Sequence, residues 1–198
     1  MTEIVLASRN KHKIEEWQAT LKKYIDGVEI LSLDDVGVYG EIEEDGTTFS
    51  ENAVIKAKAA AKSGYISVGE DSGLSVNALD GEPGVYSARY AGEHGNDAAN
   101  NSLLLSRLEG VTDRSATFVC AIGCVLPDGE EKVFLGESHG VIIDEYRGKG
   151  GFGYDPLFYV ESMKKTFSEM TAEEKNSISH RGRAIEKFAE WLMNYKEN

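Results

Sequence analysis

The chain has 198 residues, of which 34 are acidic and 21 are lysine or arginine, giving a formal net charge of −13. This charge argues against nucleic-acid polymers and anionic membranes as partners, because both are bound by broad basic faces. A small anionic substrate is still compatible, since a metal ion held by carboxylates can dominate one site of an acidic protein. The length suits one domain, 1–198, without a separable linker.

The first third of the chain predicts a strand and two helices. Residues 4–7 form a short apolar run typical of a buried strand, and apolar residues then recur at helical spacing over 14–24. Thr48 and Glu51 have the spacing of a capping box, which indicates the start of a second helix. Gly64 is a plausible end for that helix.

The rest of the chain predicts further strands with both crossover and hairpin connections. A strand at 66–68 leads into the glycine-flanked segment 69–73. Two β-rich runs, 116–126 and 132–143, flank the turn sequence Pro127-Asp128-Gly129 and predict a hairpin. We therefore expect an α/β protein with a mixed sheet. The other predicted elements are a helix at 96–108, a strand at 157–160, a capping box at 171–174 and a final helix at 183–195.

The two cysteines, Cys120 and Cys124, lie in one apolar run. On one face of a strand they would be about 13 Å apart, beyond the ~7 Å limit for a disulfide. We interpret them as small buried hydrophobic residues in a reducing compartment. The apolar run at 4–7 is too short for a signal peptide, and no stretch reaches membrane-spanning length, so we expect a cytoplasmic protein.

The first candidate site is the junction between the first strand and the first helix. A helix start favours anions, so cations clustered there indicate a bound anion between them. Lys13 is the best phosphate candidate, although exposed charges after a capped strand are an equally open interpretation. The junction lacks the glycines of a P-loop. Its residues are Ser8, Arg9, Asn10, Lys11, His12 and Lys13.

Two groups of carboxylates are candidates for metal binding and catalysis. Residues 41–45 are strongly acidic, and this is either a solvated loop or a source of one Mg²⁺ ligand, for which Glu44 is the candidate. Lys56 on the following helix could face the same site. Glu70 and Asp71 follow an apolar strand, where unpaired charge is costly, and alternation sends them to opposite faces. We expect Asp71 to hold Mg²⁺ and to orient or deprotonate a water molecule.

The C-terminal third holds two further candidates. The glycine-rich segment 148–156 is either a mobile loop or a pocket, in which Phe152 stacks on a base and Asp155 accepts a hydrogen bond from a purine N1–H. Cationic side chains then cluster around His180, whose ordinary interpretation is structural. Together they suit phosphate oxygens and a purine 6-oxo group.

Six segments recur in this order in one known family, the inosine triphosphate pyrophosphatases, also called dITP/XTP pyrophosphatases. The chain resembles that family over essentially its whole length, and the signal comes from the ordered set. The segments are Ser8-Arg9-Asn10-Lys11-His12-Lys13, Thr48-Phe49-Ser50-Glu51-Asn52-Ala53, Gly69-Glu70-Asp71-Ser72-Gly73-Leu74, Gly84-Val85-Tyr86-Ser87-Ala88-Arg89-Tyr90, Gly151-Phe152-Gly153-Tyr154-Asp155-Pro156 and Ser179-His180-Arg181-Gly182.

The resemblance implies a long mixed β-sheet flanked by helices, with two lobes, an active-site cleft between them, and a homodimer. It implies Mg²⁺-dependent conversion of ITP, dITP and XTP to the monophosphate and pyrophosphate. Asp71 would be the proton acceptor and a metal ligand, Glu44 a second ligand, and Lys13 and Lys56 would contact phosphates. The implied nucleotide site comprises Ser8, Arg9, Asn10, Lys11, His12, Lys13, Ser72, Phe152, Gly153, Tyr154, Asp155, Lys175, His180 and Arg181.

The chain departs from some family members at two of these segments. They have Thr-Gly-Asn at 8–10 and Asp-Asp at 70–71, and in both places this chain keeps the hydroxyl and carboxylate chemistry. Other functions are compatible with the same residues: a pyrophosphatase acting on modified pyrimidine nucleotides, a non-catalytic nucleotide sensor, or, against the charge balance, a nucleic-acid-binding module. The role of residues 86–90 is open between loop packing, a dimer contact and substrate contact.

Overall fold

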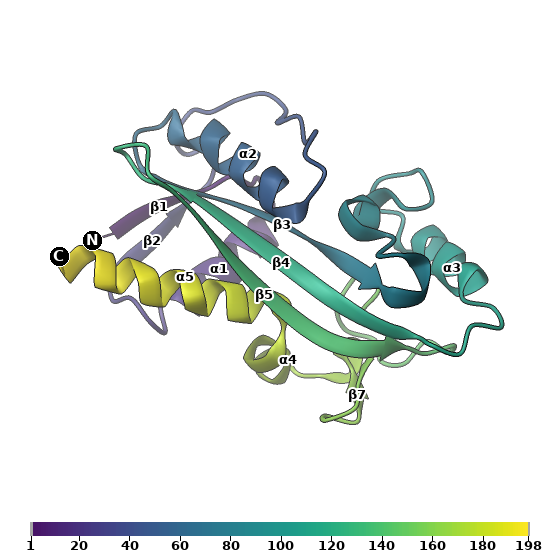
Figure 1. The fold of residues 1–198 in the computed structure, drawn as a ribbon. Helices are drawn as coiled ribbons and strands as arrows, with labels where there is room; N and C mark the ends of the chain where they lie inside the picture. The colour runs from purple at the N-terminus through teal and green to yellow at the C-terminus, as the bar shows by residue number, and fades with distance from the viewer. Residues whose placement is uncertain (1, 198) are drawn as a thin grey trace. The chain divides into compact units, whose positions relative to one another are not determined.

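The computed structural model describes residues 2–197 and, within them, a seven-stranded sheet in the order β2-β1-β3-β4-β5-β6-β7 (Figure 1). Side chains at 12, 196 and 197 are outside this description. None of the described helices is both long and apolar enough to cross a lipid bilayer. The strands are β1 (Thr2–Leu6), β2 (Val28–Leu31), β3 (Ile66–Val76), β4 (Ser115–Val125), β5 (Glu131–Ile142), β6 (Phe158–Val160) and β7 (Lys165–Thr166).

Helices connect the first four strands. The α-helices are α1 (Lys11–Leu21), α2 (Phe49–Ala61), α3 (Asp97–Arg107), α4 (Ala172–Ile178) and α5 (His180–Glu197), and the 3₁₀ turns are η1 (Asn77–Leu79), η2 (Gly84–Arg89) and η3 (Phe167–Glu169). The capping box of Thr48 and Glu51 opens α2, and that of Thr171 and Glu174 opens α4, both as predicted.

The sheet is mixed, which confirms the predicted fold class. Strand β1 runs parallel to β2 and β3, with Ile4 opposite Ile30 on one side and Ile66 on the other. Strand β6 runs antiparallel to β5 and β7. Neighbouring strands β4 and β5 are joined by a turn closed by the hydrogen bond from Leu126 N to Glu130 O, 2.9 Å, so the predicted hairpin is present.

The described chain divides into two compact units. One consists of residues 2–71, 120–136 and 181–197, and the other of residues 72–119 and 137–180. We call them the first and second unit. The single domain 1–198 that the sequence led us to expect stays a prediction.

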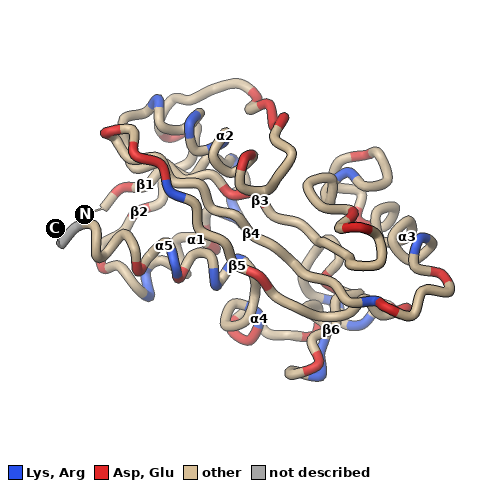
Figure 2. The backbone as a smooth tube through the Cα atoms, in the orientation of Figure 1, with Lys and Arg blue, Asp and Glu red and all other residues tan. Residues whose placement is uncertain are grey.

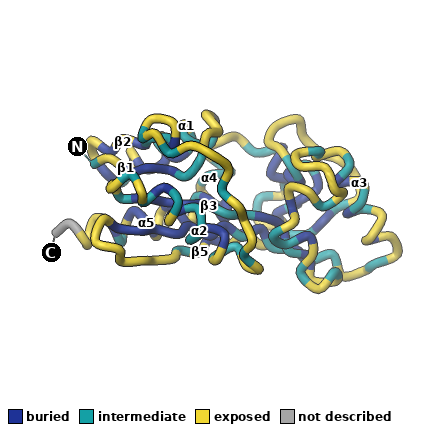
Figure 3. The backbone as a smooth tube through the Cα atoms, turned by 90° about the horizontal axis from the view of Figure 1, so that it is seen from above, coloured by how far each residue is buried: buried dark blue, intermediate teal, exposed yellow. Residues whose placement is uncertain are grey.

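In the first unit, helices cover both faces of the strands (Figure 1). On one face, Ile4 and Leu6 of β1 pack with Trp17 of α1 and Phe188 of α5, and on the other face Val5 packs against Ala60 of α2. This is the alternation of a strand buried on both faces. Figure 3 shows buried residues along these strands and exposed residues along the loops. Cys120 and Cys124 are free and buried in the first of these cores, as expected.

Strand β3 is longer than predicted. The predicted strand covered 66–68 and led into the glycine-flanked segment 69–73, but the strand continues without interruption to Val76. Gly69 serves close packing: a Cβ there would lie 2.2 Å from the carbonyl oxygen of Ala53 and 2.6 Å from Cβ of Lys56, both on α2. Gly123 of β4 makes the same approach, because its Cβ would lie 2.7 Å from the Ala53 carbonyl carbon.

The second unit has its own core, built around aromatic rings. Phe118 of β4 lies edge-on to Phe158 of β6 at 4.7 Å and is stacked on Phe167 of η3 at 5.6 Å. Leu104 of α3 and Leu74 of β3 belong to the same cluster. Tyr154 of the glycine-rich segment 148–156 belongs to this core.

Several helix boundaries differ from prediction, and α1 and α5 show this most clearly. Helix α1 ends at Leu21, so Tyr24 lies beyond it in a turn. Helix α5 begins at His180 instead of 183. His180 and Arg181 therefore lie in its first turn and are buried. Helical spacing marked the exposed and buried faces of α5 but not its start, because Arg181 is buried by polar contacts with Glu70 and His180 by stacking on Phe118.

Candidate active site

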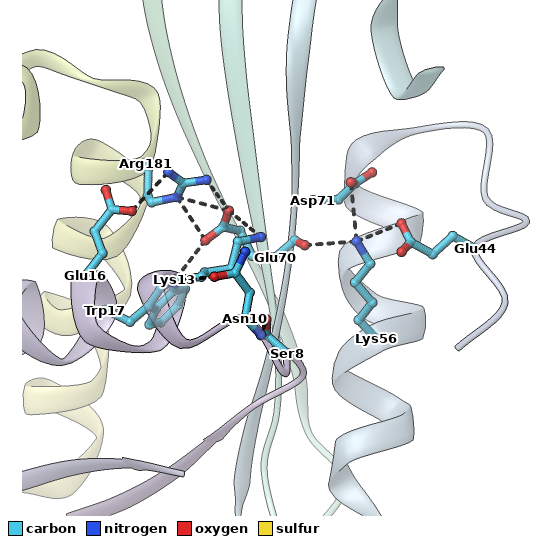
Figure 4. Close-up of polar contacts among 10 residues, drawn as sticks. All are labelled: Ser8, Asn10, Lys13, Glu16, Trp17, Glu44, Lys56, Glu70, Asp71 and Arg181. Carbon is cyan, nitrogen blue, oxygen red and sulfur yellow. Dashed lines mark hydrogen bonds and ion pairs between the residues drawn. The ribbon is translucent and has the colours of Figure 1, made fainter. Parts of the chain in front are cut away.

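Adjacent carboxylates on β3 occupy different environments. Glu70 contacts side chains of α1 and α5, and Asp71 contacts side chains of α2 (Figure 4). Neighbouring strand residues point to opposite faces, so this division follows from the strand itself. The predicted alternation is present.

Glu70 is enclosed by donors. Its carboxylate accepts bonds from Trp17 Nε1 at 2.7 Å and from Arg181 Nη2 at 2.9 Å, and it forms an ion pair with Lys13 Nζ at 3.2 Å. Arg181 also pairs with Glu16 at 3.2 Å. Burial acts to raise the pKa of Glu70, but the charges of Arg181 and Lys13 outweigh it and hold that pKa far below its usual range. Glu70 is therefore a fixed buried anion.

Around Asp71, the nearby donors do not outweigh the effect of burial as they do around Glu70. Asn52 Nδ2 donates to its Oδ2 at 3.1 Å, and Lys56 Nζ lies 3.4 Å from its Oδ1. Burial raises the pKa of Asp71, and the nearby charge of Glu44 adds to this, while Lys56 and Asn52 act in the opposite direction. A carboxylate whose pKa is raised by desolvation accepts a proton more readily, which suits a general base.

Glu44 and Asp71 converge on one cation. Lys56 Nζ is 2.7 Å from Glu44 Oε2 and 3.4 Å from Asp71 Oδ1 (Figure 4). Figure 2 shows the acidic residues of the segment before α2, which carries Glu44. The predicted metal ligands thus lie on either side of one positive charge, and their oxygens are the hard donors that Mg²⁺ uses.

The donor set fits a metal that is shared with substrate. Within the described residues no group of three or more His, Cys, Asp or Glu side chains gathers as a metal site. Mg²⁺ commonly takes one or two carboxylates and completes its shell with water and phosphate oxygens. The carboxylates of Glu44 and Asp71 fit that pattern.

The junction before α1 is organised by its own side chains. Asn10 caps the helix, and its Oδ1 accepts from Lys13 N at 3.2 Å, while Ser8 Oγ accepts from Asn10 N at 3.1 Å. Arg9 is bound away from the helix start, with Nε on Asp34 at 2.9 Å. Lys11 is exposed, and the side chain of His12 lies outside the described residues.

The glycine-rich segment forms a tight turn around Asp155. Asp155 is buried, and its Oδ2 accepts from Phe152 N at 3.0 Å and from Lys175 Nζ at 2.6 Å. Gly151 has a φ of +74°, and a Cβ there would lie 2.2 Å from Asp155 Oδ2, so only glycine fits. Phe152 is 62% exposed. The turn thus leaves Phe152 largely exposed, and its stacking on a base stays a prediction.

The three side chains predicted to donate to the substrate, Lys175, His180 and Arg181, lie in different environments. Lys175 Nζ lies over the Phe152 ring, 5.1 Å from its centre. The ring of His180 is buried and stacked on Phe118 at 4.8 Å. Arg181 serves Glu70 in this structure, so its contact with a nucleotide stays a prediction, as does that of His180. Ser72 is half-buried on β3 directly after Asp71.

The structure adds Asn52 and Trp17 to the candidate site, both missed by sequence reasoning. Asn52 is buried, and besides binding Asp71 its Oδ1 accepts from Gly46 N at 2.9 Å. It therefore links the acidic segment to Asp71. An asparagine inside a predicted helix is unfavourable, and that signal could have identified it. Trp17 gave no such signal, because its helical spacing already explained it.

A comparison with protein families identifies the family of this chain. The model of the Ham1 family matches residues 4–191. The chain belongs to the Ham1 family. This confirms the resemblance drawn from the ordered segments.

Named relatives cover nearly the whole chain. A dITP/XTP pyrophosphatase of Geobacter sulfurreducens is 52% identical over 93% of this chain and 94% of that protein. One of Clostridium perfringens is 49% identical over 97% and 98%. The solved Ham1 protein of Staphylococcus aureus is 44% identical, with a TM-score of 0.89 over 98% of this chain and all of that one. The Ham1 protein of Coxiella burnetii is 43% identical, with a TM-score of 0.90.

Proposed function

We propose that this chain is a nucleoside-triphosphate pyrophosphohydrolase that converts ITP, dITP and XTP to the monophosphate and pyrophosphate. The observation that carries the proposal is the convergence of Glu44 and Asp71 on one cation, next to the buried Glu70 network that holds Lys13. A phosphate-binding module would gain nothing from additional carboxylates unless a metal ion was also bound. The relatives named dITP/XTP pyrophosphatases support the substrate class.

Glu44 and Asp71 would hold Mg²⁺. When bound, the metal would supply positive charge at the phosphate oxygens, where charge grows in the transition state. A homodimer is proposed on the family resemblance, and mass in solution checks it. A cytoplasmic location is proposed because Cys120 and Cys124 are free thiols, which suits a reducing compartment.

Asp71 is the proposed base. A water molecule oriented by its carboxylate attacks the α-phosphorus, and the bond from that phosphorus to the oxygen bridging to the β-phosphate breaks. The carboxylate takes the proton of the water, and the electron pair of the broken bond leaves on pyrophosphate. Lys56, 3.4 Å from Asp71, and Lys13 are placed to bind phosphate oxygens. Most of the rate enhancement then comes from positioning and electrostatics.

Base recognition is proposed for the turn at 151–155. Phe152 would stack on the purine, and Lys175 beside it would donate to the 6-oxo group. The 6-amino group of adenine would bring a second donor to that position and leave both unpaired. Sites that depend on such pairing discriminate by factors of about 10⁴.

The first test measures pyrophosphate and inorganic phosphate released with Mg²⁺ from ITP, XTP, dITP, GTP, ATP and dTTP. We expect pyrophosphate from the deaminated purines, little inorganic phosphate, and loss of activity with a chelator that excess Mg²⁺ restores. Release from dTTP instead would keep the chemistry and refute the base preference. Binding of ITP without release would favour the nucleotide sensor.

A further inference from the structure

Helix α3 holds one residue of the glycine-rich turn by both of its backbone polar groups. Asp97 Oδ2 accepts a hydrogen bond from Gly153 N at 2.7 Å, and Asn101 Nδ2 donates to Gly153 O at 2.9 Å. Residues four apart on a helix lie on the same face, so the two side chains reach the same residue together. We call this pair the α3 clamp.

Other contacts hold the residues after Gly153. The buried Tyr154 donates its hydroxyl proton to Ser87 O at 2.7 Å, and Asp155 is held by Lys175. Ser87 in turn accepts from Leu74 N at 2.9 Å. The stretch 86–90, whose role the sequence left open, therefore contacts the turn through the hydrogen bond between Ser87 and Tyr154. Phe152 is left with a fixed backbone and an exposed ring.

The burial of Asn101 indicates that the clamp has a purpose beyond packing. Its side chain is 2% exposed, and its Oδ1 has no hydrogen-bond partner among the described residues. A buried acceptor without a partner costs about 1–3 kcal/mol. An apolar side chain would avoid that cost, and the feature of Asn101 that an apolar residue could not supply is the bond to Gly153.

We propose that Asp97 and Asn101 are positioning residues that preorganise Phe152 to stack on the purine base. This rests on the proposed function, since it assigns them to the base end of that site. A turn ordered only on binding would lower affinity by the cost of its ordering, whereas the clamp orders it during folding. Removing the clamp should therefore weaken binding of the base and leave binding of the phosphates unchanged.

The test compares Asp97→Ala, Asp97→Asn and Asn101→Ala with the control Ser102→Ala, which changes an exposed residue of the same helix. Asparagine at 97 can still accept from Gly153 N, so it should rescue the alanine variant. Hydrogen exchange at Gly153 reports the clamp directly. Calorimetry with IMP and with pyrophosphate, both with Mg²⁺, reports the base and phosphate ends separately.

We expect faster exchange at Gly153 and roughly tenfold weaker IMP binding in Asp97→Ala, the effect of one hydrogen bond. Pyrophosphate binding should not change, and Asp97→Asn and Ser102→Ala should resemble wild type. The double variant of Asp97 and Asn101 should lose less than the sum of the single losses, because both hold one residue.

Unchanged exchange at Gly153, or unchanged IMP affinity despite faster exchange, would overturn the proposal. Equal weakening of IMP and pyrophosphate would do the same, because it would indicate general damage. Wild-type protein that binds IMP but releases no pyrophosphate from ITP would refute the hydrolysis separately, and the clamp measurements would still stand.

Discussion

The Glu70–Asp71 region and the turn at 151–155 are ordered by different means. The Glu70 carboxylate is held by the opposite charge of Arg181, which lies 111 positions away in the chain. The turn is closed over three positions by Asp155 on Phe152 N, and it depends on backbone groups and glycine conformations. The Glu70–Asp71 region should therefore be disturbed by protonation of a carboxylate or by loss of an ion-pair partner. The turn should be disturbed by a larger side chain at a glycine position.

Asp71→Asn should show the largest effect, on turnover. The amide keeps the bond from Asn52 but cannot accept the proton of the water, so we expect kcat to fall by about 10²–10⁴. Steady-state release of pyrophosphate from ITP measures this. A folded variant with near-normal kcat would refute Asp71 as the base.

The same variant should not lose stability. Asp71 in the unfolded chain loses its proton at the ordinary pKa of 3.8, and the folded chain loses it at higher pH. Between those pKa values the folded state holds more protons, so the unfolding free energy falls as pH rises. Asn at 71 removes that penalty, and denaturant unfolding at pH 7 should give a stability at or above wild type.

Glu70→Gln should be the reverse case, with its main effect on folding. It leaves Arg181 buried without a full counter-charge, which typically costs about 3–5 kcal/mol. In wild type, the folded-state pKa of Glu70 lies below its ordinary value of 4.5, so the unfolded state takes up the proton first and stability falls as pH drops below 4.5. The variant should lack that part of the acid dependence in urea titrations. An unchanged midpoint at pH 7 would contradict the role of the network.

Gly151→Ala tests the turn, and Gly153→Ala is its matched control. Both glycines have positive φ, at +74° and +59°, so alanine costs about 1–2 kcal/mol at either. At 151 a Cβ also meets Asp155, and overpacking adds about 1–3 kcal/mol. No atom lies within 4 Å of a Cβ at 153. Thermal unfolding should rank 151 as the more damaging position, and equal losses would refute the clash.

Arg9→Ala should have the smallest effect. Its ion pair with Asp34 joins side chains that are 39% and 58% exposed, and such pairs contribute about 0–1 kcal/mol. Chemical unfolding should differ little from wild type, and ITP hydrolysis should stay close to it. A large rise in KM would show that Arg9 contacts the nucleotide after all.

The sequence predicted local features well. The capping boxes, the hairpin and the opposite faces of Glu70 and Asp71 depend on residues close in the chain, where spacing alone determines the outcome. The metal pair could be predicted as residue types, but its convergence on Lys56 required the fold. The uninterrupted β3 was missed because glycine permits both a turn and close packing, and only the neighbouring helix decides between them.

The contacts of Arg181, Trp17 and Asn101 could not be predicted, because each joins segments that are distant in the chain. The sequence predicts Arg181 as a substrate donor, because a cation near a histidine suits phosphate, and that role stays a prediction. The buried carboxylate of Glu70 accepts hydrogen bonds from the guanidinium group that a phosphate would bind. Proximity in the sequence gives no information about this contact.

The missing side chains at Gly69 and Gly123 set how deeply α2 is seated on the sheet. Asn52 and Lys56 extend from that helix toward Asp71, so the depth of the helix fixes how far each donor reaches. The absence of side chains at these two strand positions thus determines the distances from Asn52 and Lys56 to Asp71. The pKa of Asp71 could therefore be changed without replacing any charged residue, by substituting a larger residue for one of the two glycines that pack under α2.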